Sequence, residues 1–244
     1  MDVAIVTVGD ELLSGETENT NASWLARTIT EQGGTVERIL AVGDDRETIA
    51  RYVEIWAETF DAVVVSGGLG GTHDDVTMAA VADAFERDLV IDPQIRSAVV
   101  ASSRSFVEDH PDLADRYDLG LDPDAWAEIV DGGEVLENPE GLSPGCVVSN
   151  VYVLPGVPSE MRAVFESVAS EFGGDRVSTT LSTDAPESAL IDVVEELRAQ
   201  FDVSVGIYPG ERGDPNRVTI RGTDGVTIER ARDWLADRID TIST

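Results

Sequence analysis

The sequence predicts an α/β protein with a three-layer fold, in which helices cover both faces of a mostly parallel sheet, followed by a smaller α+β domain. Near-continuous apolar runs indicate strands that are buried on both faces, and helical patterns separate these runs. The segment FGGD at 172–175 interrupts the pattern and marks a boundary. We therefore expect one domain over residues 1–174 and a second over residues 175–244.

The expected elements of the larger domain alternate along the chain. Strands are predicted where apolar residues run together, at residues 3–8, 36–42, 62–65 and 151–154. Helices are predicted where apolar residues recur every three or four positions, at 21–31, 46–59, 76–85, 95–107 and 159–171. Because strands that alternate with helices usually pair in parallel, this order predicts a parallel sheet.

The second domain has a different order of elements. A strand (176–181) and a helix (186–200) precede two strands (203–208 and 217–221) and a last helix (226–239). Two strands in succession indicate an α+β unit, which here has about the minimum size for independent folding.

The charge of the chain is strongly negative. The 244 residues include 48 acidic side chains and 17 basic ones, all of them arginine, which gives a net charge of −31. Such self-repulsion destabilises a compact fold in dilute buffer, whereas molar salt shortens the Debye length to ~3 Å and screens it. We interpret the composition as halophilic adaptation, since the acidic residues are spread along the whole chain. An acidic protein that binds cations or basic partners is the alternative, and the charge argues against nucleic-acid binding.

The sequence shows no signal for a membrane or for export. No apolar run approaches the ~20 residues that span a bilayer, and the start MDVAIVTVGDELL lacks the basic region of a signal peptide. The single cysteine, Cys146, excludes an internal disulfide. We expect a cytoplasmic protein without membrane association.

The most informative segment is DAVVVSGGLGGTHDDVTM at 61–78. Its apolar run leads into a glycine-dense turn with two carboxylates before the next helix, and the residues concerned are Gly67, Gly68, Gly70, Gly71, Thr72, His73, Asp74 and Asp75. Glycines let backbone N–H groups approach a ligand, and a helix start favours an anion. Carboxylates beside a phosphate need a cation between them. The segment predicts a phosphorylated, nucleotide-like ligand bound with a divalent metal.

Three further motifs follow predicted strands: GDELLSG at 9–15, VGDD at 42–45 and LPGVPSEM at 154–161. Parallel strands end at the same edge of their sheet, and ligands of open α/β sheets bind at that edge. We therefore expect all four motifs to converge on one site.

Taken together, the motifs resemble the molybdopterin-binding-domain superfamily of the MoaB/Mog type, and most closely the N-terminal part of the competence/damage-inducible protein A (CinA) family. The resemblance covers about residues 3–172 and is carried by TVGDELLSGETENTNASWLA, AVGDD, SGGLGGTHDDVT, NPEGLSPG and YVLPGVPSEM. It implies a molybdopterin-binding-domain-like α/β fold that binds molybdopterin or a nucleotide. The CinA branch implies metal-dependent hydrolysis of ADP-ribose by a pyrophosphatase. The branch of molybdenum cofactor biosynthesis implies adenylylation of molybdopterin.

The resemblance also assigns roles to residues. Asp75 and Asp44 are the expected catalytic carboxylates, and with Asp74 they are the expected ligands of a divalent cation (Mg²⁺, Mn²⁺ or Co²⁺); a potassium ion is left open as a further cofactor. The residues expected to hold or surround the ligand are Gly67, Gly68, Gly70, Gly71, Thr72, Asp10, Glu11, Pro155 and Gly156. The implied protein is a homo-oligomer.

Structural alternatives stand beside these roles. Asp75 could be a carboxylate that interacts with a helix dipole, and Asp44 or Asp45 could cap the helix at 46–59. Asn19 and Asn21 could cap the helix at 21–31 or bind the ligand. His73 could donate to a phosphate or be a solvated turn residue.

Two departures from the family bear on function. The chain ends at Thr244, so the amidase domain of full-length CinA proteins is not expected, and DAWAE at 124–128 replaces the usual basic segment before the NPEGLSPG motif. Three functions therefore remain open: hydrolysis of a nucleotide-sugar pyrophosphate such as ADP-ribose, which we favour, adenylyl transfer to molybdopterin, and ligand binding without catalysis.

Overall fold

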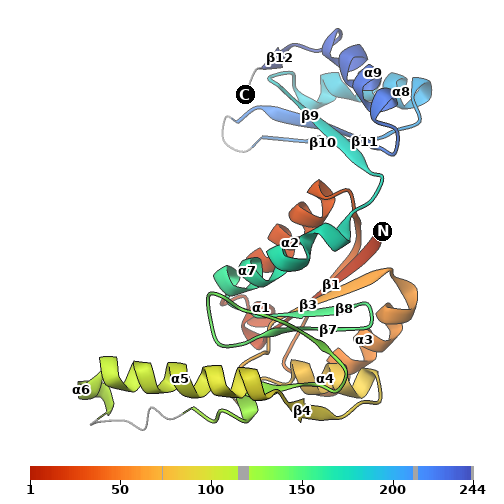
Figure 1. Ribbon diagram of the computed structural model, residues 1–244. Coiled ribbons are helices and arrows are strands. Elements are labelled where there is room, and N and C mark those ends of the chain that lie inside the picture. The colour runs from red at the N-terminus through yellow and green to blue at the C-terminus, as the bar shows by residue number, and fades with distance from the viewer. Residues whose placement is uncertain (73, 115–120, 211–213, 243–244) are drawn as a thin grey trace. The chain divides into compact units, whose positions relative to one another are not determined.

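The computed structural model describes residues 1–72, 74–114, 121–210 and 214–242. It contains two compact units, Met1–Gly173 and Gly174–Thr244, and Figure 1 gives the labels of their elements. His73, a candidate for donating to a phosphate, lies outside the described residues.

The larger unit is built on a six-stranded sheet in the order β2-β1-β3-β8-β7-β6. Its first four strands in that order are parallel neighbours: β2 (Thr35–Val42), β1 (Asp2–Val8), β3 (Ala62–Ser66) and β8 (Val151–Leu154). β7 (Gly145–Val148) runs antiparallel to β8, and β6 (Glu134–Leu136) runs antiparallel to β7. The predicted mostly parallel sheet is thus confirmed.

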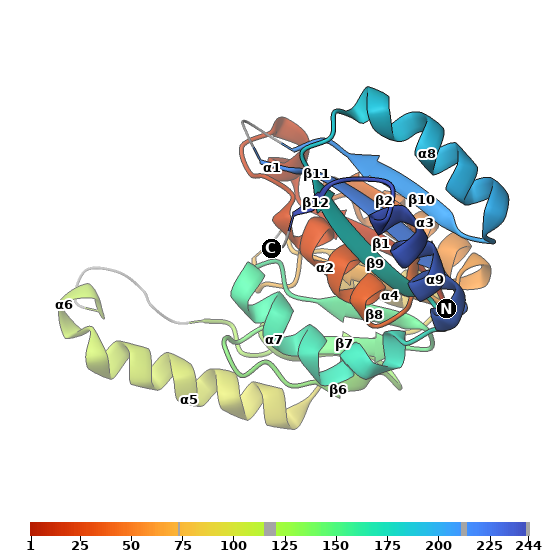
Figure 2. The same ribbon diagram turned by 90° about the horizontal axis from the view of Figure 1, so that it is seen from above.

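Helices cover both faces of this sheet. α2 (Thr20–Glu31) and α7 (Pro158–Val168) pack on one face, and α3 (Arg46–Thr59) and α4 (Thr77–Ala84) pack on the other. Figure 2 shows α2 and α7 side by side above the strands. The unit therefore has the predicted three layers.

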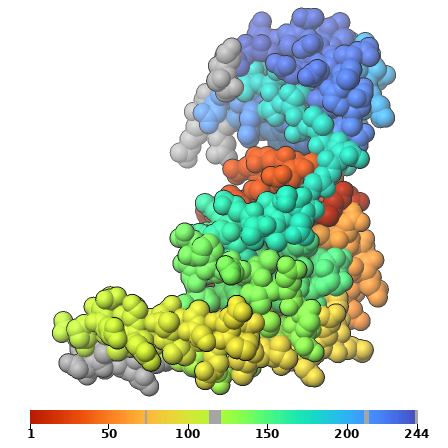
Figure 3. All heavy atoms as spheres, in the orientation of Figure 1, coloured from red at the N-terminus to blue at the C-terminus, as the bar shows by residue number. Residues whose placement is uncertain are grey.

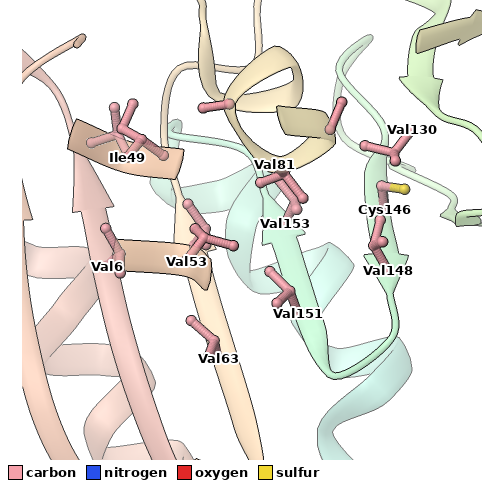
Figure 4. Close-up of a cluster of buried hydrophobic side chains, with 14 of the residues drawn as sticks. Val6, Ile49, Val53, Val63, Val81, Val130, Cys146, Val148, Val151 and Val153 are labelled. Atoms are coloured by element: carbon pink, nitrogen blue, oxygen red, sulfur yellow. The ribbon is translucent and has the colours of Figure 1, made fainter. Parts of the chain in front are cut away.

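The strand sequences explain why both faces are covered. All five residues of β3, AVVVS, are buried, and their side chains alternate between the two faces. Val63 and Val65 belong to the same buried cluster as Ile49 and Val53 of α3, and Figure 4 shows Val63 near Val53. Val64 belongs to the cluster formed with α2 and α7. Each fully buried valine contributes about 1.5–3 kcal/mol. An uninterrupted apolar run thus supports a strand between two helical layers.

Several elements were not predicted. α1 (Asp10–Ser14) begins directly after β1, and β4 (Leu89–Ile91) pairs with β5 (Glu128–Val130) in a separate two-stranded sheet. The helix predicted over 159–171 ends at Val168 and continues as a 3₁₀ turn over Ala169–Phe172. These differences concern short segments, whose patterns are too brief to identify from periodicity alone.

α5 (Pro93–Asp109) leads away from the sheet, and α6 (Pro111–Ala114) follows it. Figure 3 shows α5 extending from the body of the larger unit. Val99 is the buried residue of α5, which agrees with this exposed position.

The smaller unit is an antiparallel sheet with two helices. Its strands are ordered β10 (Ser204–Tyr208), β11 (Asn216–Gly222), β9 (Val177–Thr183) and β12 (Thr241–Ile242). α8 (Glu187–Gln200) and α9 (Gly225–Ala236) supply the rest of a core whose fully buried members include Leu190, Leu197 and Ile220. The predicted α+β unit is confirmed.

No helix in the described part of the chain is long and apolar enough to cross a membrane. Cys146 is fully buried, and this burial raises the pKa of its thiol to about 11, so that it is a packed and unreactive side chain.

Candidate functional site

A pocket of about 230 Å³ lies at the carboxyl edge of the parallel strands. All four strand-end motifs contribute to it, together with the start of α2. Its lining consists of Thr7, Val8, Gly9, Glu11, Leu12, Thr17, Glu18, Asn19, Thr20, Asn21, Asp44, Ser66, Gly67, Gly68, Asp74, Asp75, Gly156 and Pro158. Segments more than 140 positions apart in the sequence therefore meet at one site, because parallel strands end at the same edge.

Some of the predicted site residues line this pocket, and others do not. Those that line it are Glu11, Asp44, Gly67, Gly68, Asp74, Asp75 and Gly156. Those that lie outside its lining are Asp10, Gly70, Gly71, Thr72 and Pro155. Gly70 lines a neighbouring cavity of about 50 Å³, and a Cβ on Gly71 would overlap the indole ring of Trp126. The second half of the glycine segment therefore packs against protein instead of facing the pocket.

The first glycine pair forms the tight part of the turn after β3. Gly67 has φ 110° and Gly68 has φ 64°, both in the range that favours glycine. A Cβ on Gly67 would overlap the carbonyl oxygen of Val8, and one on Gly68 would overlap the Thr77 hydroxyl. The pair thus lets the turn pack closely between β1 and the start of α4.

Asp75 is tied to the same segment through Thr72. The Thr72 N–H donates to Asp75 Oδ2 at 3.0 Å, the Thr72 hydroxyl donates to the same oxygen, and the Asp75 N–H donates to the Thr72 carbonyl at 3.1 Å. The Thr72 hydroxyl therefore faces Asp75 in this structure. Asp75 holds the segment and also lines the pocket.

Asp44 and Asp10 connect the end of β2 with the start of α1. The Asp10 N–H donates to Asp44 Oδ2 at 2.9 Å, and the Asp44 N–H donates to Asp10 Oδ1 at 3.3 Å. Burial raises the pKa of the Asp44 carboxyl; the hydrogen bond from Asp10 opposes this, and the negative charges of Asp10, Glu11 and Asp74 add to it. Asp45, not Asp44, caps α3 by accepting from the Thr48 N–H at 2.8 Å.

The raised pKa gives a prediction for the ligand-free protein. The folded state binds the Asp44 proton more tightly than the unfolded state, so stability falls as pH rises through the interval between the two pKa values. We expect Asp44→Asn to raise the melting temperature at pH 7, because it removes a carboxylate that folding disfavours. The gain should disappear at about pH 3, where an unperturbed aspartate is protonated in either state.

Thermal melts in molar KCl at both pH values measure this effect. The matched control is Asp45→Asn, because the Thr48 hydroxyl and N–H lower the pKa of the Asp45 carboxyl. Its substitution should give no gain at pH 7. An equal rise in both variants would show that only the net charge of the protein matters, and would contradict the prediction.

The described lining is acidic and holds no arginine. Its carboxylates are Glu11, Glu18, Asp44, Asp74 and Asp75. Favourable positive potential comes from helix starts: α4 begins beside the glycine turn, α7 begins with Pro158 in the lining, and neither has a side-chain cap. A phosphate would find N–H groups here but would also need a cation to offset the carboxylates.

The donor set constrains how a cation could be held. Among the described residues, no three His, Cys, Asp or Glu side chains converge closely enough to hold a metal ion by themselves. Carboxylates nevertheless line the pocket, and burial together with the charges of its neighbours raises the pKa of Asp44. The arrangement fits a cation that shares its ligands with a bound phosphate, as Mg²⁺ commonly does.

Polar residues from the α2 side complete the site. Asn19 caps α2 by accepting from the Ala22 N–H at 3.1 Å, and its amide also donates to the Thr7 hydroxyl at 2.8 Å. Asn21 instead donates to the Gly156 carbonyl at 2.7 Å and to the Ser66 hydroxyl at 3.2 Å. Ser66 was not among the predicted site residues. Its position could have identified it, since a polar residue at the end of a buried strand lies at the ligand-binding edge of the sheet.

The segment that builds this pocket also determines the family. Residues 4–173 match the family described as "Probable molybdopterin binding domain". The chain belongs to this molybdopterin-binding-domain family. The match ends where the larger compact unit ends, so the smaller unit lies outside the family domain.

Relatives of this molybdopterin-binding-domain protein agree with the assignment. A protein of Archaeoglobus fulgidus is 34% identical over 235 residues, which cover 95% of each chain. The CinA-like protein of Salinibacter ruber is 34% identical over 229 residues, which cover 87% of this chain and 53% of that relative. The CinA crystal structure from Thermoplasma acidophilum is 33% identical with a TM-score of 0.58, and the match covers 70% of this chain and 97% of that one. The predicted resemblance to CinA is confirmed.

Proposed function

We propose that the pocket binds a nucleotide sugar together with a divalent cation, and that the protein hydrolyses the pyrophosphate bond of a ligand such as ADP-ribose. The observation that carries this proposal is the combination of carboxylates with two helix starts that lack side-chain caps, in one pocket at the carboxyl edge of the sheet. Helix starts favour phosphate and carboxylates favour a cation, so a metal-bound pyrophosphate satisfies both.

Different groups of the pocket have different roles in the proposed reaction. The Gly68 N–H and the N–H groups that follow Thr77 in α4 and Pro158 in α7 are suited to bind phosphate oxygens and to stabilise charge that develops on them. The Gly67 N–H instead donates to the Leu154 carbonyl at 3.1 Å. A bound divalent cation would lower the pKa of a water and neutralise phosphate charge. Asp75 and Asp44 would hold this cation together with the ligand's oxygens.

The chemical step is an in-line displacement. The oxygen of water attacks one phosphorus of the pyrophosphate, the bridging P–O bond breaks, and the departing phosphate keeps the electron pair, which gives AMP and ribose 5-phosphate. The proton of the attacking water passes to a carboxylate oxygen of the pocket lining that the cation does not occupy.

The test is direct. The protein is incubated with ADP-ribose and Mg²⁺, Mn²⁺ or Co²⁺ in molar KCl, which screens its charge of −31, and AMP is quantified. AMP release that depends on the metal supports the proposal, and no release with any of the three metals contradicts it. In the latter case, AMP transfer from ATP to molybdopterin would point to the adenylyltransferase activity, and calorimetric binding without turnover would point to a ligand-binding module.

A further inference from the structure

The polar lining of the pocket has two chemically different parts. The first part consists of carboxylates. Glu11 lies in α1, Glu18 precedes α2, Asp44 follows β2, and Asp74 and Asp75 precede α4. Neutral hydroxyl and amide groups come from the ends of β1 and β3 and the start of α2, among them Thr7, Asn21 and Ser66. A cation and a phosphate suit the first part, which leaves the second for the uncharged part of a ligand.

Hydrogen bonds fix the orientation of the Asn21 amide within this neutral part. Its nitrogen donates to the Gly156 carbonyl at 2.7 Å and to the Ser66 hydroxyl at 3.2 Å. Ser66 passes its own hydrogen to the Pro155 carbonyl at 2.9 Å, so it accepts from Asn21. Because carbonyl oxygens can only accept, the amide group cannot be turned over. The Asn21 oxygen must therefore point away from both partners.

This leaves an acceptor without a donor. Asn21 Oδ1 exposes less than 1 Å² and has no hydrogen-bond partner among the described residues, while the Asn21 side chain lines the pocket. Leaving a buried acceptor unpaired is unfavourable, so a donor that enters the pocket gains more than an ordinary surface hydrogen bond would give. The donor must be an N–H or O–H group, since Oδ1 repels phosphate oxygens.

We propose that Asn21 determines specificity by accepting a hydrogen bond from the uncharged part of the ligand, which is a sugar hydroxyl or a ring or amino N–H group. The inference rests on the proposed function in that it takes the ligand to be a nucleotide-like molecule. The two hydrogen bonds of the Asn21 nitrogen hold its oxygen in place before the ligand arrives, so little ordering is needed on binding.

The experiment compares ligands with and without such a donor. ADP-ribose and inorganic pyrophosphate, each with Mg²⁺ in molar KCl, are titrated calorimetrically into the wild-type protein and into Asn21→Ala. We expect the dissociation constant of ADP-ribose to rise about fivefold to tenfold in Asn21→Ala, the range for one lost neutral hydrogen bond. That of pyrophosphate should change by less than about twofold.

Asn150→Ala is the matched control. Its amide nitrogen also donates two hydrogen bonds, to the carbonyl oxygens of Ala57 at 2.9 Å and Phe60 at 3.0 Å, but Asn150 lies outside the pocket lining. Asn150→Ala should leave both dissociation constants unchanged.

The possible outcomes separate the two proposals. Equal weakening of both ligands in Asn21→Ala would mean that Asn21 only holds the turn at Gly156. Unchanged binding would mean that the ligand makes no hydrogen bond to the Asn21 oxygen. Either result overturns this inference alone. If the wild-type protein binds neither ligand, the proposed function fails as well.

Discussion

Replacing Asp75 by asparagine is expected to lower kcat/KM for AMP release from ADP-ribose by about 100-fold to 1000-fold, which is the range for losing one preorganised electrostatic group. The asparagine oxygen can still accept from Thr72, whose N–H lies 3.0 Å from Asp75 Oδ2 in the wild-type protein. The segment should therefore keep its conformation. What is lost is the negative charge in the pocket, which the proposed cation and attacking water need.

The control for Asp75→Asn is Asp92→Asn. Asp92 also accepts backbone N–H groups, from Gln94 at 2.8 Å and Ile95 at 2.9 Å, and it caps α5 outside the pocket lining. Since asparagine caps helices as well as aspartate does, this variant should retain activity within about twofold. Full activity of Asp75→Asn would contradict the catalytic role and leave Asp75 as a carboxylate that only holds the turn.

Asp44 illustrates a conflict between the stability of the folded protein and its proposed function. Burial, reinforced by the neighbouring carboxylates, raises the pKa of Asp44, so the folded protein carries an unfavourable charge there when no ligand is bound. Asp44→Asn is expected to be more stable, and under the proposed reaction it should also be less active. Such opposite effects are typical of sites where a ligand or cation compensates for local repulsion.

The sequence predicted the layers of the larger unit because burial there is periodic. The run AVVVS can be buried on both faces only between two helical layers, and the patterns of α2 and α3 supply those layers. The convergence of the strand-end motifs followed from the parallel arrangement, which places every strand end at one edge.

The finer contacts of the site could not be predicted in this way. The bond from Asn21 to Gly156 spans 135 positions, and nothing in either local segment specifies the other. The contact between Gly71 and Trp126 likewise joins a loop to a short 3₁₀ turn that has no periodic signal. As a result, Gly70 and Gly71 could not be separated from Gly67 and Gly68 by sequence, although only the first pair in the turn lines the pocket.

Gly67→Ala is expected to destabilise the larger unit by about 3 kcal/mol, which combines backbone strain at a positive φ with overpacking, each about 1–3 kcal/mol. The observed φ is 110°, and the new Cβ would overlap the Val8 carbonyl oxygen, which belongs to a central strand and cannot move aside. Thermal melts of this unit should show a decrease in melting temperature of about 10 °C.

Gly15→Ala is the control that separates the cost of backbone strain at a positive φ from the cost of steric overlap by the new Cβ. Gly15 also has a positive φ, 76°, but a Cβ there would meet no atom within 4 Å, so this variant should lose only about 1 kcal/mol. A similar loss in both variants would show that the Val8 contact imposes no constraint. A much larger loss for Gly67→Ala, together with weaker pyrophosphate binding, would show that the close packing of β1 against the turn is what holds the Gly68 N–H in position for a phosphate.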